Sequence, residues 1–297
     1  MNTHLSIRIQ DQMPHFSKGQ RLIAKYIEEH YDKVAFMTAS KLGSTVGVSE
    51  STVVRFATEL GYDGYPELQR AMQEMIRSKL TSVQRIEVTK ERIGKNDILD
   101  VMLAQDMDVI RRTMEATSHK DFYEAVDAII AAKKIYILGA RSSVALATFL
   151  SYYLGMLFDS VQCIQATSEA EIFEQMIYMT KDDVMIGLSF PRYSKKASKA
   201  MHFAHDQGAK VIAITDSLLS PIAEFADYRL LARSDISAIV DSLVAPLSLI
   251  NSLLVALALK MESRVTKVFQ NLEDIWDEYG VYEKVDEAEN DNDNKKE

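Results

Sequence analysis

The chain has 297 residues, of which 47% are hydrophobic, and a formal net charge of −9. This length suffices for two domains, and the composition excludes a disordered, collagen-like or disulfide-stapled protein. No run approaches the about 20 apolar residues of a membrane span, and the first residues lack a signal-peptide pattern, so no membrane association is expected. The single cysteine, Cys163, can form no internal disulfide and indicates a cytoplasmic location. Its apolar neighbours favour a core position over a nucleophilic role.

The charge is distributed unevenly along the chain. Residues 1–80 carry 10 Lys and Arg against 9 Asp and Glu, whereas residues 271–297 carry 3 against 11. This acidic tail has few apolar residues to offset the entropy cost of ordering, so we expect its end to be disordered. Without the tail the chain is nearly neutral with a slightly basic front, so charge permits DNA binding without requiring it.

The first predicted helix follows Ser17, a suitable N-cap residue. Leu22, Ile23, Tyr26 and Ile27 then recur at the spacing of one helix face. This pattern indicates an amphipathic helix that packs against a core.

The next segment, residues 38–60, has the spacing of a helix-turn-helix. Thr38 and Ser49 can cap two short helices. Gly47 falls in the turn between them, where positive φ is cheap only for glycine, and Gly43 is small enough for the two helices to approach closely. The segment therefore predicts a helical DNA-binding unit.

The second of these helices, if it begins at Glu50, turns short hydroxyls and one long cation outward. Arg can bind both major-groove acceptors of guanine, and Ser and Thr can reach base edges or phosphates, so this face suits the major groove. A solvated surface arginine is the alternative for Arg55. For Glu50, contact with a cytosine amino group and simple complementation of the helix dipole are both open, and the dipole is favoured. The candidate DNA-binding residues are Lys41, Ser49, Ser51, Thr52 and Arg55.

Two phrases make this region specific: S-x-x-T-V-V-R-F from Ser49, followed by L-G-Y-x-G-Y from Leu60. With them, residues 16–72 resemble the N-terminal domain of the RpiR/MurR family of bacterial transcription regulators. The resemblance implies an all-α helix-turn-helix domain, which we assign to residues 1–80, and a double-stranded DNA operator as partner. Because such operators are read as paired half-sites, a dimer is expected.

Residues 81–120 are polar and helix-prone and predict a helical connector with a helix from Ile98 to Met114. Beyond them, Val- and Ile-rich strands alternate with helices, which predicts an α/β domain over residues 121–270 with three layers and a mostly parallel sheet. The expected strands are residues 133–140, 161–164, 183–189, 210–216 and 228–232, and the expected helices start at Ser142, near Glu169, at Ser194 and, as a short one, after Ser220.

The segment from Asp241 to Phe269 predicts a long apolar helix that starts near Asp241. It has too many apolar positions for one face, so some must contact the core and others a partner chain. Pro246 is tolerable only in the first turn or at a kink.

Ligands of parallel sheets bind at the carboxyl ends of strands beside helix N-termini. Two loops, residues 139–143 and 189–196, have this position and are rich in hydroxyls and cations that can donate to an anion. Serines in one loop alone are more simply helix caps, but two such loops at corresponding places favour an anion site. Its candidate residues are Gly139, which allows close backbone approach, and Ser142, Ser143, Ser189, Arg192, Ser194 and Lys195.

The phrases ILGARSS, LSFPRYSKKA and AITDSLLSPIAEFAD resemble the sugar isomerase (SIS) domain. The resemblance implies a phosphosugar ligand and a homodimer or homotetramer. The loop after the third strand commonly reads S-x-S-G-x-T in SIS domains; Ser189 matches the first hydroxyl and Ser194 the last. Pro191 and Arg192 replace the middle serine and glycine, so the resemblance retains an anionic ligand but leaves its identity open.

An enzyme is the competing hypothesis. Sugar-phosphate isomerisation needs a positioned base, and Glu169 and Glu171 are the available carboxylates, although the start of a helix favours acids in any case. His202 and His205 are spaced to share a metal, but no third ligand stands out. We therefore expect no catalytic residue, cofactor or metal, and a regulator of carbohydrate metabolism whose DNA affinity responds to a phosphosugar. The alternative is an aldose–ketose isomerase with an accessory DNA-binding domain.

Overall fold

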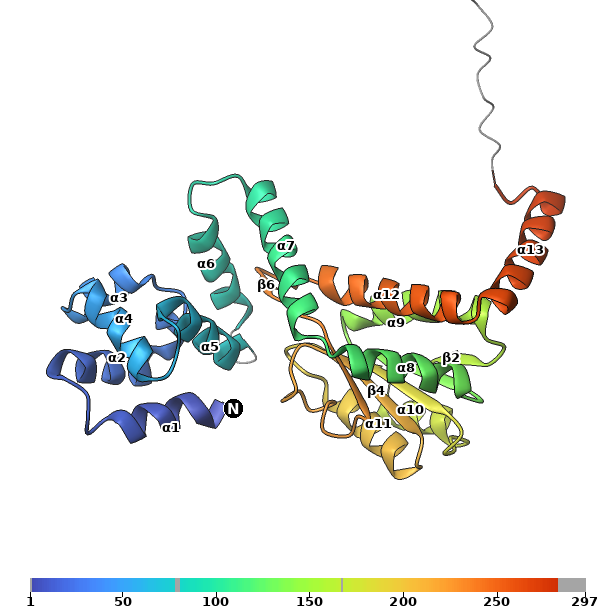
Figure 1. The fold of residues 1–297 in the computed structure, drawn as a ribbon, viewed down its shortest axis with the longest axis horizontal. Helices are drawn as coiled ribbons and strands as arrows, with labels where there is room; N and C mark the ends of the chain where they lie inside the picture. Colours follow the sequence, from blue (N-terminus) through green and yellow to red (C-terminus); the bar gives the residue numbers. More distant parts are fainter. Residues whose placement is uncertain (1, 78–80, 167, 283–297) are drawn as a thin grey trace, which may run out of the picture.

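The computed structural model describes residues 2–77, 81–166 and 168–282, and folds into two domains joined by a pair of helices (Figure 1). The N-terminal domain is entirely helical, as expected. Its first helix was not anticipated, because only Leu5 and Ile9 are buried among its described side chains. The helices are α1 (Asn2–Gln12), α2 (Lys18–Val34), α3 (Ala39–Val46), α4 (Glu50–Glu59) and α5 (Tyr65–Arg77).

The core of this domain includes the inner face of α4, opposite the hydroxyls and the cation that were predicted to point outward. Val53, Phe56 and Ala57 have no exposed surface, and the ring of Phe56 lies 5.0 Å from that of Phe16. Burial of each of the two larger side chains, Val53 and Phe56, stabilises the fold by about 1.5–3 kcal/mol. Gly61, with φ +83, ends the helix.

The connector consists of two helices, α6 (Ser82–Ile93) and α7 (Ile98–Ala116), which stand between the domains (Figure 1). α7 confirms the helix predicted from Ile98. α6 was not predicted. It opens with a capping box in which Thr81 and Gln84 each bind the other's backbone N–H.

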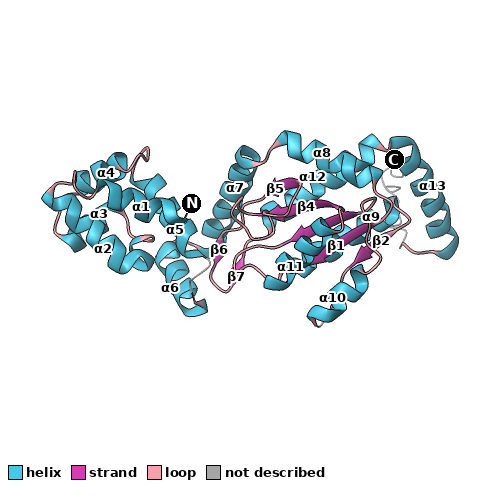
Figure 2. Ribbon diagram, turned by 90° about the horizontal axis from the view of Figure 1, so that it is seen from below, coloured by secondary structure: helices cyan, strands magenta, loops and turns pink. Residues whose placement is uncertain are grey.

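The C-terminal domain is built on a five-stranded parallel sheet with the order β2-β1-β3-β4-β5. All expected strands are present. A separate two-stranded antiparallel hairpin lies between the sheet and the connector (Figure 2). The strands are β1 (Ile135–Gly139), β2 (Val161–Cys163), β3 (Val184–Leu188), β4 (Lys210–Thr215) and β5 (Tyr228–Leu231), and the hairpin is β6 (Ile236–Ser237) and β7 (Val240–Asp241).

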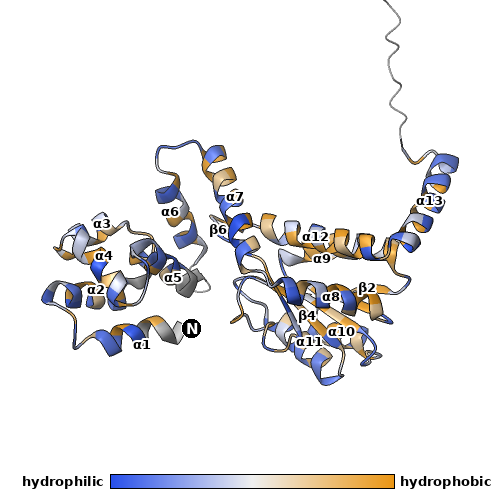
Figure 3. Ribbon diagram, in the orientation of Figure 1, coloured by the Kyte–Doolittle hydropathy of each residue, from blue (hydrophilic) through white to orange (hydrophobic). Residues whose placement is uncertain are grey.

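Helices cover both faces of the sheet, which confirms the three-layer architecture. One hydrophobic cluster joins α8, α9 and α12 to alternate residues of β1, β3 and β4, and a second joins α10 and α11 to the other residues of those strands. α9 and α12 are the most hydrophobic helices of this domain in Figure 3. The helices are α8 (His119–Ala131), α9 (Ser143–Leu157), α10 (Glu169–Met176), α11 (Lys195–Asp206) and α12 (Val244–Lys260).

The prediction of a short helix after Ser220 is wrong, because this segment forms consecutive turns. The amide of Ala223 bonds to the carbonyl of Ser220, three residues back, rather than four. The carbonyls that would continue a helix have side-chain donors instead: Ser198 donates to Pro221, and the Nε of Arg229 donates to Ala223. Tertiary hydrogen bonds therefore replace the helical ladder.

The C-terminal apolar segment forms two helices rather than one. α12 starts at Val244, with Pro246 in its first turn, and a 99° bend at Met261 leads into α13 (Glu262–Tyr279). α13 projects from the domain (Figure 1), has no buried residue and runs past residue 271, where we expected the tail to begin. The expected disordered end lies in residues 283–297, outside the described residues.

Among the described residues, no single helix has both the length and the apolar content needed to cross a membrane. The bent pair α12 and α13 meets those criteria only when its two helices are taken together.

Candidate DNA-binding and anion-binding sites

The helix-turn-helix is fixed by local contacts at its turn. Gly47 has φ +80, and the amides of Gly47 and Val48 both donate to the carbonyl of Gly43, at 2.9 and 2.8 Å. A Cβ on Gly43 would lie 2.8 Å from the carbonyl oxygen of Val48. Both glycines are therefore required, one for a left-handed turn and the other for close approach.

The caps of the two helices are those predicted. The hydroxyl of Thr38 accepts from the amide of Lys41 at 3.1 Å, and that of Ser49 accepts from the amide of Thr52 at 3.3 Å. The Ser49 hydroxyl also lies within 2.9 Å of those of Ser51 and Thr52. The result is a compact group of three hydroxyls at the N-terminus of α4, where partial positive charge favours phosphate.

The outward face of α4 exposes Ser51 and Arg55, with Thr52 half-buried beside them. Within the described part of the chain, Arg55 forms no hydrogen bond or ion pair, so its guanidinium is available to a ligand. Lys41 is exposed on α3. Glu50 lies in the first turn of α4, which is compatible with both interpretations of its role.

The two loops of the predicted anion site leave adjacent strands. β1 and β3 pair in parallel, with Gly139 opposite Leu188, so both loops begin at the same level of the same edge. The strand order reverses at this point, since β2 lies on one side of β1 and β3 on the other. Sheets of this topology bind ligands in the crevice at such a reversal.

Gly139 has a structural role in addition to the one expected. A Cβ there would lie 2.3 Å from the carbonyl oxygen of Ser143, so glycine is needed for α9 to approach the end of β1. Ser143 is buried, whereas Ser142 is exposed and makes no capping hydrogen bond with its side chain. Arg141, with φ +59, adds an exposed cation in a conformation unusual for a non-glycine residue.

The loop after β3 is anchored at both ends. Ser189 is buried, and its hydroxyl accepts from the amide of Ser194 at 3.4 Å. The Ser194 hydroxyl caps α11 by accepting from Ala197, also at 3.4 Å. Arg192 and Lys195 are exposed, so this loop holds two fixed hydroxyls and two accessible cations beside a helix N-terminus.

The structure adds residues to the candidate anion site that were not predicted from the sequence. The hydroxyl of Tyr193 donates to Asp216, just after β4, at 2.8 Å and so ties the β3 loop to the next strand. Arg141 supplies a further cation. The signals were present in the sequence: a cation inside ILGARSS, and polar residues directly after the apolar run of β4.

The alternative catalytic groups have other contacts. Glu169 pairs with Lys199 at 2.9 Å. The ring of His202 stacks on Phe225 at 4.5 Å, and the described residues contain no group of three potential metal ligands. Burial, the largest cause, raises the pKa of the Cys163 thiol, which lowers the fraction of nucleophilic thiolate.

Comparisons with known proteins agree with this architecture. Residues 3–79 match the helix-turn-helix domain of the rpiR family and residues 128–256 match the SIS domain. Two relatives are named HTH-type transcriptional regulators. One, from Clostridium perfringens, is 24% identical over 72% of this chain and 76% of its own; the other, from Haemophilus influenzae, is 28% identical over 71% and 74%.

Solved structures show the same fold. The sugar isomerase domain of an RpiR transcription factor from Sphaerobacter thermophilus is 25% identical and covers 60% of this chain and 98% of its own, with a TM-score of 0.57. The NanR protein of Vibrio vulnificus, solved with ManNAc-6P, is 22% identical and covers 93% and 98%, also with a TM-score of 0.57. The chain described here therefore belongs to the rpiR family of helix-turn-helix transcription regulators that carry a SIS domain.

Proposed function

We propose that this chain binds double-stranded operator DNA through α4 and a phosphosugar at the sheet edge between the β1 and β3 loops, and that the phosphosugar changes operator affinity. The observation that carries the ligand site is the pairing of Gly139 with Leu188, which brings two loops with hydroxyls and cations to one strand-order reversal. The complex of NanR with ManNAc-6P, a protein of the same fold, supports a ligand of this class.

The chemistry of the site fits a sugar phosphate. Hydroxyls of Ser142, Ser189 and Ser194 and the amides at the start of α11 supply neutral donors, while Arg192 and Lys195 supply charge-assisted bonds to phosphate oxygens. We assign no catalytic role. The carboxylate of Glu169 is engaged with Lys199, and the named relatives are regulators.

The ligand is tested by thermal shift of the full chain against hexose 6-phosphates, N-acetylhexosamine 6-phosphates and pentose 5-phosphates. The parent sugars and inorganic phosphate serve as controls. A ligand present at 100 times its Kd adds about 2.7 kcal/mol to stability. Arg192→Ala should reduce the shift from the best sugar phosphate, whereas Lys199→Ala, which removes a cation on α11 beyond the loop, should leave it intact. Equal shifts from phosphorylated and parent sugars would contradict a phosphate site.

The switch is tested with DNA fragments that the full chain selects from a random pool. Fluorescence anisotropy then measures operator Kd with and without the best sugar phosphate. Thermodynamic linkage requires the ligand to bind the DNA-competent and DNA-incompetent states differently, so an unchanged Kd at saturating ligand would refute the switch. Turnover of the same compound, abolished by Glu171→Gln, would favour the isomerase alternative.

A homodimer that pairs through α12 is part of the proposal. α12 is largely a core helix, yet it exposes Val255 (57%) and Leu259 (71%), and α13 beyond it exposes Tyr279 (74%). Paired half-sites in DNA call for two copies of α4. Light scattering should give twice the monomer mass for the wild type and the monomer mass for a Val255→Asp, Leu259→Asp variant.

The cytoplasmic location stays a prediction.

A further inference from the structure

The segment between β5 and α12, residues 232–243, carries the β6–β7 hairpin away from the sheet and onto the connector (Figure 2). It begins at the carboxyl end of β5, the edge at which the proposed phosphosugar loops also lie. It is therefore placed to contact both the ligand edge and the helices that lead to the DNA-binding domain.

The hairpin is anchored to α6 by a buried ion pair. The guanidinium of Arg85, whose side chain is 4% exposed, lies 2.8 Å from the carboxylate of Asp241, which is 15% exposed. At the tip of the hairpin, the amide of Ala238 donates to the hydroxyl of Thr89 at 2.8 Å. Ile236 is 4% exposed and belongs to the hydrophobic cluster of the DNA-binding domain. The hairpin thus contacts the front of the molecule as well as the connector.

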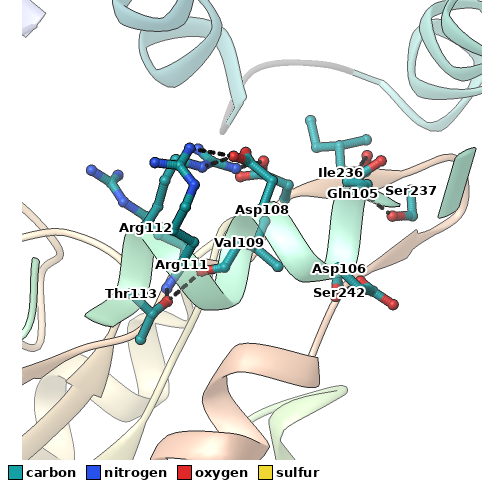
Figure 4. Close-up of polar contacts among 12 residues, drawn as sticks. Gln105, Asp106, Asp108, Val109, Arg111, Arg112, Thr113, Ile236, Ser237 and Ser242 are labelled. Carbon is teal, nitrogen blue, oxygen red and sulfur yellow. Dashed lines mark hydrogen bonds and ion pairs between the residues drawn. The ribbon is translucent and has the colours of Figure 1, made fainter. Parts of the chain in front are cut away.

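A second set of contacts joins the same segment to α7 (Figure 4). Arg112 forms an ion pair with Asp235, and Asp106 accepts a hydrogen bond from the hydroxyl of Ser242 at 2.6 Å. The side-chain amide of Gln105 donates from its Nε2 to the carbonyl of Ile236 at 3.3 Å. Polar contacts therefore hold the segment at its start, middle and end.

A chain of hydrogen bonds connects the ligand loop to these contacts. The carbonyl of Ser189 accepts from the buried hydroxyl of Thr215 at 2.7 Å, and the carbonyl of Thr215 accepts from the amide of Ala232 at 2.8 Å. The next amide, that of Arg233, donates to the hydroxyl of Thr113 on α7 at 2.8 Å. Ser189 is thus connected to α7 through a continuous series of hydrogen bonds and one peptide bond.

The junction is also not fully packed. A cavity of about 240 Å³ lies where the DNA-binding domain, the connector and the hairpin meet, lined among others by Phe36, Gln73 and Ile236. Arg112 faces this cavity and binds two carboxylates, since Asp108 on its own helix lies 2.8 Å from its Nε. If the hairpin shifts, Arg112 keeps a partner. A shift of the hairpin away from α7 therefore leaves the Arg112 guanidinium paired, which lowers the cost of a second arrangement at this contact.

We propose that residues 232–242 form a latch that couples the phosphosugar loop to the position of the DNA-binding domain. The inference rests on the proposed function and names its route of regulation. Ligand contact at Ser189 shifts Thr215 and Ala232, and the hairpin then changes its ion pairs and hydrogen bonds with α6 and α7. Asp235 and Thr113 are positioning residues that contact neither DNA nor ligand.

The test uses full-length Asp235→Asn and Thr113→Val, which keep side-chain size but remove the charge and the acceptor, respectively. Ser234→Ala is the matched control, because this residue lies in the same segment, fully buried, and within the described residues its hydroxyl has no hydrogen-bond partner. For each protein, operator Kd is measured with and without the sugar phosphate that gives the largest thermal shift, and calorimetry measures binding of that compound without DNA.

We expect a wild-type ratio of the two operator Kd values of roughly 5–150-fold, as in other allosteric proteins. The ratio should fall below about 3-fold in Asp235→Asn and Thr113→Val, with Kd for the sugar phosphate unchanged, and persist in Ser234→Ala. A persistent ratio in both latch variants would overturn the latch while leaving the proposed function intact. A wild type that binds DNA but responds to no sugar phosphate would overturn both. Thr113→Val carries the test alone if Asp235→Asn does not fold.

Discussion

The hydroxyl of Thr215 at the end of β4 donates a 2.7 Å hydrogen bond to the carbonyl of Ser189, the first residue after β3. Both residues are buried. The bond extends the contact between two strands into the loop that holds the candidate anion-binding hydroxyls. The loop after β3 is therefore hydrogen-bonded to β4 at its first residue, and its exposed cations, Arg192 and Lys195, lie further along the chain.

Thr215→Val should destabilise the chain by about 1–3 kcal/mol, because the isosteric side chain leaves the Ser189 carbonyl buried without this donor. Thermal unfolding measures the loss. Thr58→Val is the control, since its hydroxyl donates to Val54 on an exposed helix face, and its melting temperature should change little. Equal effects of the two substitutions would contradict a structural role for the Thr215 bond.

Gly43→Ala should destabilise the helix-turn-helix by about 1–3 kcal/mol, the usual cost of overpacking, and reduce operator binding. The new Cβ would meet backbone of the turn and of the start of α4, the Val48 oxygen at 2.8 Å and the Glu50 nitrogen at 3.3 Å. Gly155→Ala in α9 is the matched control: its Cβ meets nothing within 4 Å, so it should stabilise by about 1 kcal/mol through helix propensity. An unchanged melting temperature of the Gly43→Ala variant would contradict the close approach of α3 to the start of α4.

Arg55→Ala should weaken binding to the selected operator by about 1–3 kcal/mol and relax preference at one base position. Anisotropy with operators mutated at each position measures both effects. Lys25→Ala removes an exposed cation that pairs with Glu29 on α2 and should change operator affinity much less. If Arg55→Ala weakens all sequences equally and lowers the salt dependence, Arg55 contacts phosphate rather than a base.

Alkaline pH should destabilise the DNA-binding domain through Tyr65. Burial raises the pKa of this phenol, whose hydroxyl donates to the carbonyl of Met37 at 2.8 Å. Because the folded chain keeps a proton that the unfolded chain releases, this stability is fully present below the ordinary pKa of about 10 and is lost as pH rises above it.

Urea unfolding between pH 8 and 11, followed by circular dichroism, tests this dependence. Tyr65→Phe should be less stable at pH 8 but lose less stability above pH 10 than the wild type. Tyr178→Phe, at a position 86% exposed, should retain the wild-type slope. Identical slopes for the wild type and Tyr65→Phe would assign the alkaline transition to other groups.

Local patterns in the sequence predicted much of the candidate DNA site. Caps at Thr38 and Ser49, the turn at Gly47 and the inner face of α4 depend on contacts between residues close in the chain. Such contacts leave regular signals of spacing and residue type. The central strands β1 and β3 were predicted for the same reason, since each is a continuous apolar run.

Other features depended on packing that no local pattern encodes. The turns after Ser220 form because side chains distant in the sequence supply hydrogen bonds. The long segment that was expected to form one helix bends at Met261, between the apolar α12 and the more polar α13. The close approach of α9 to Gly139 was likewise not predicted, although the role of Gly139 beside a ligand stays a prediction.

The sequence by itself determined the two kinds of domain, the residues of the helix-turn-helix and the two polar loops, because these follow from periodicity, caps and short motifs. Only the tertiary structure decided that the β1 and β3 loops lie side by side and that the hairpin reaches α6 and α7. The reason is physical. Strand order and the pairing of Arg85 with Asp241, 156 residues apart, are long-range choices that depend on how whole faces of the chain pack.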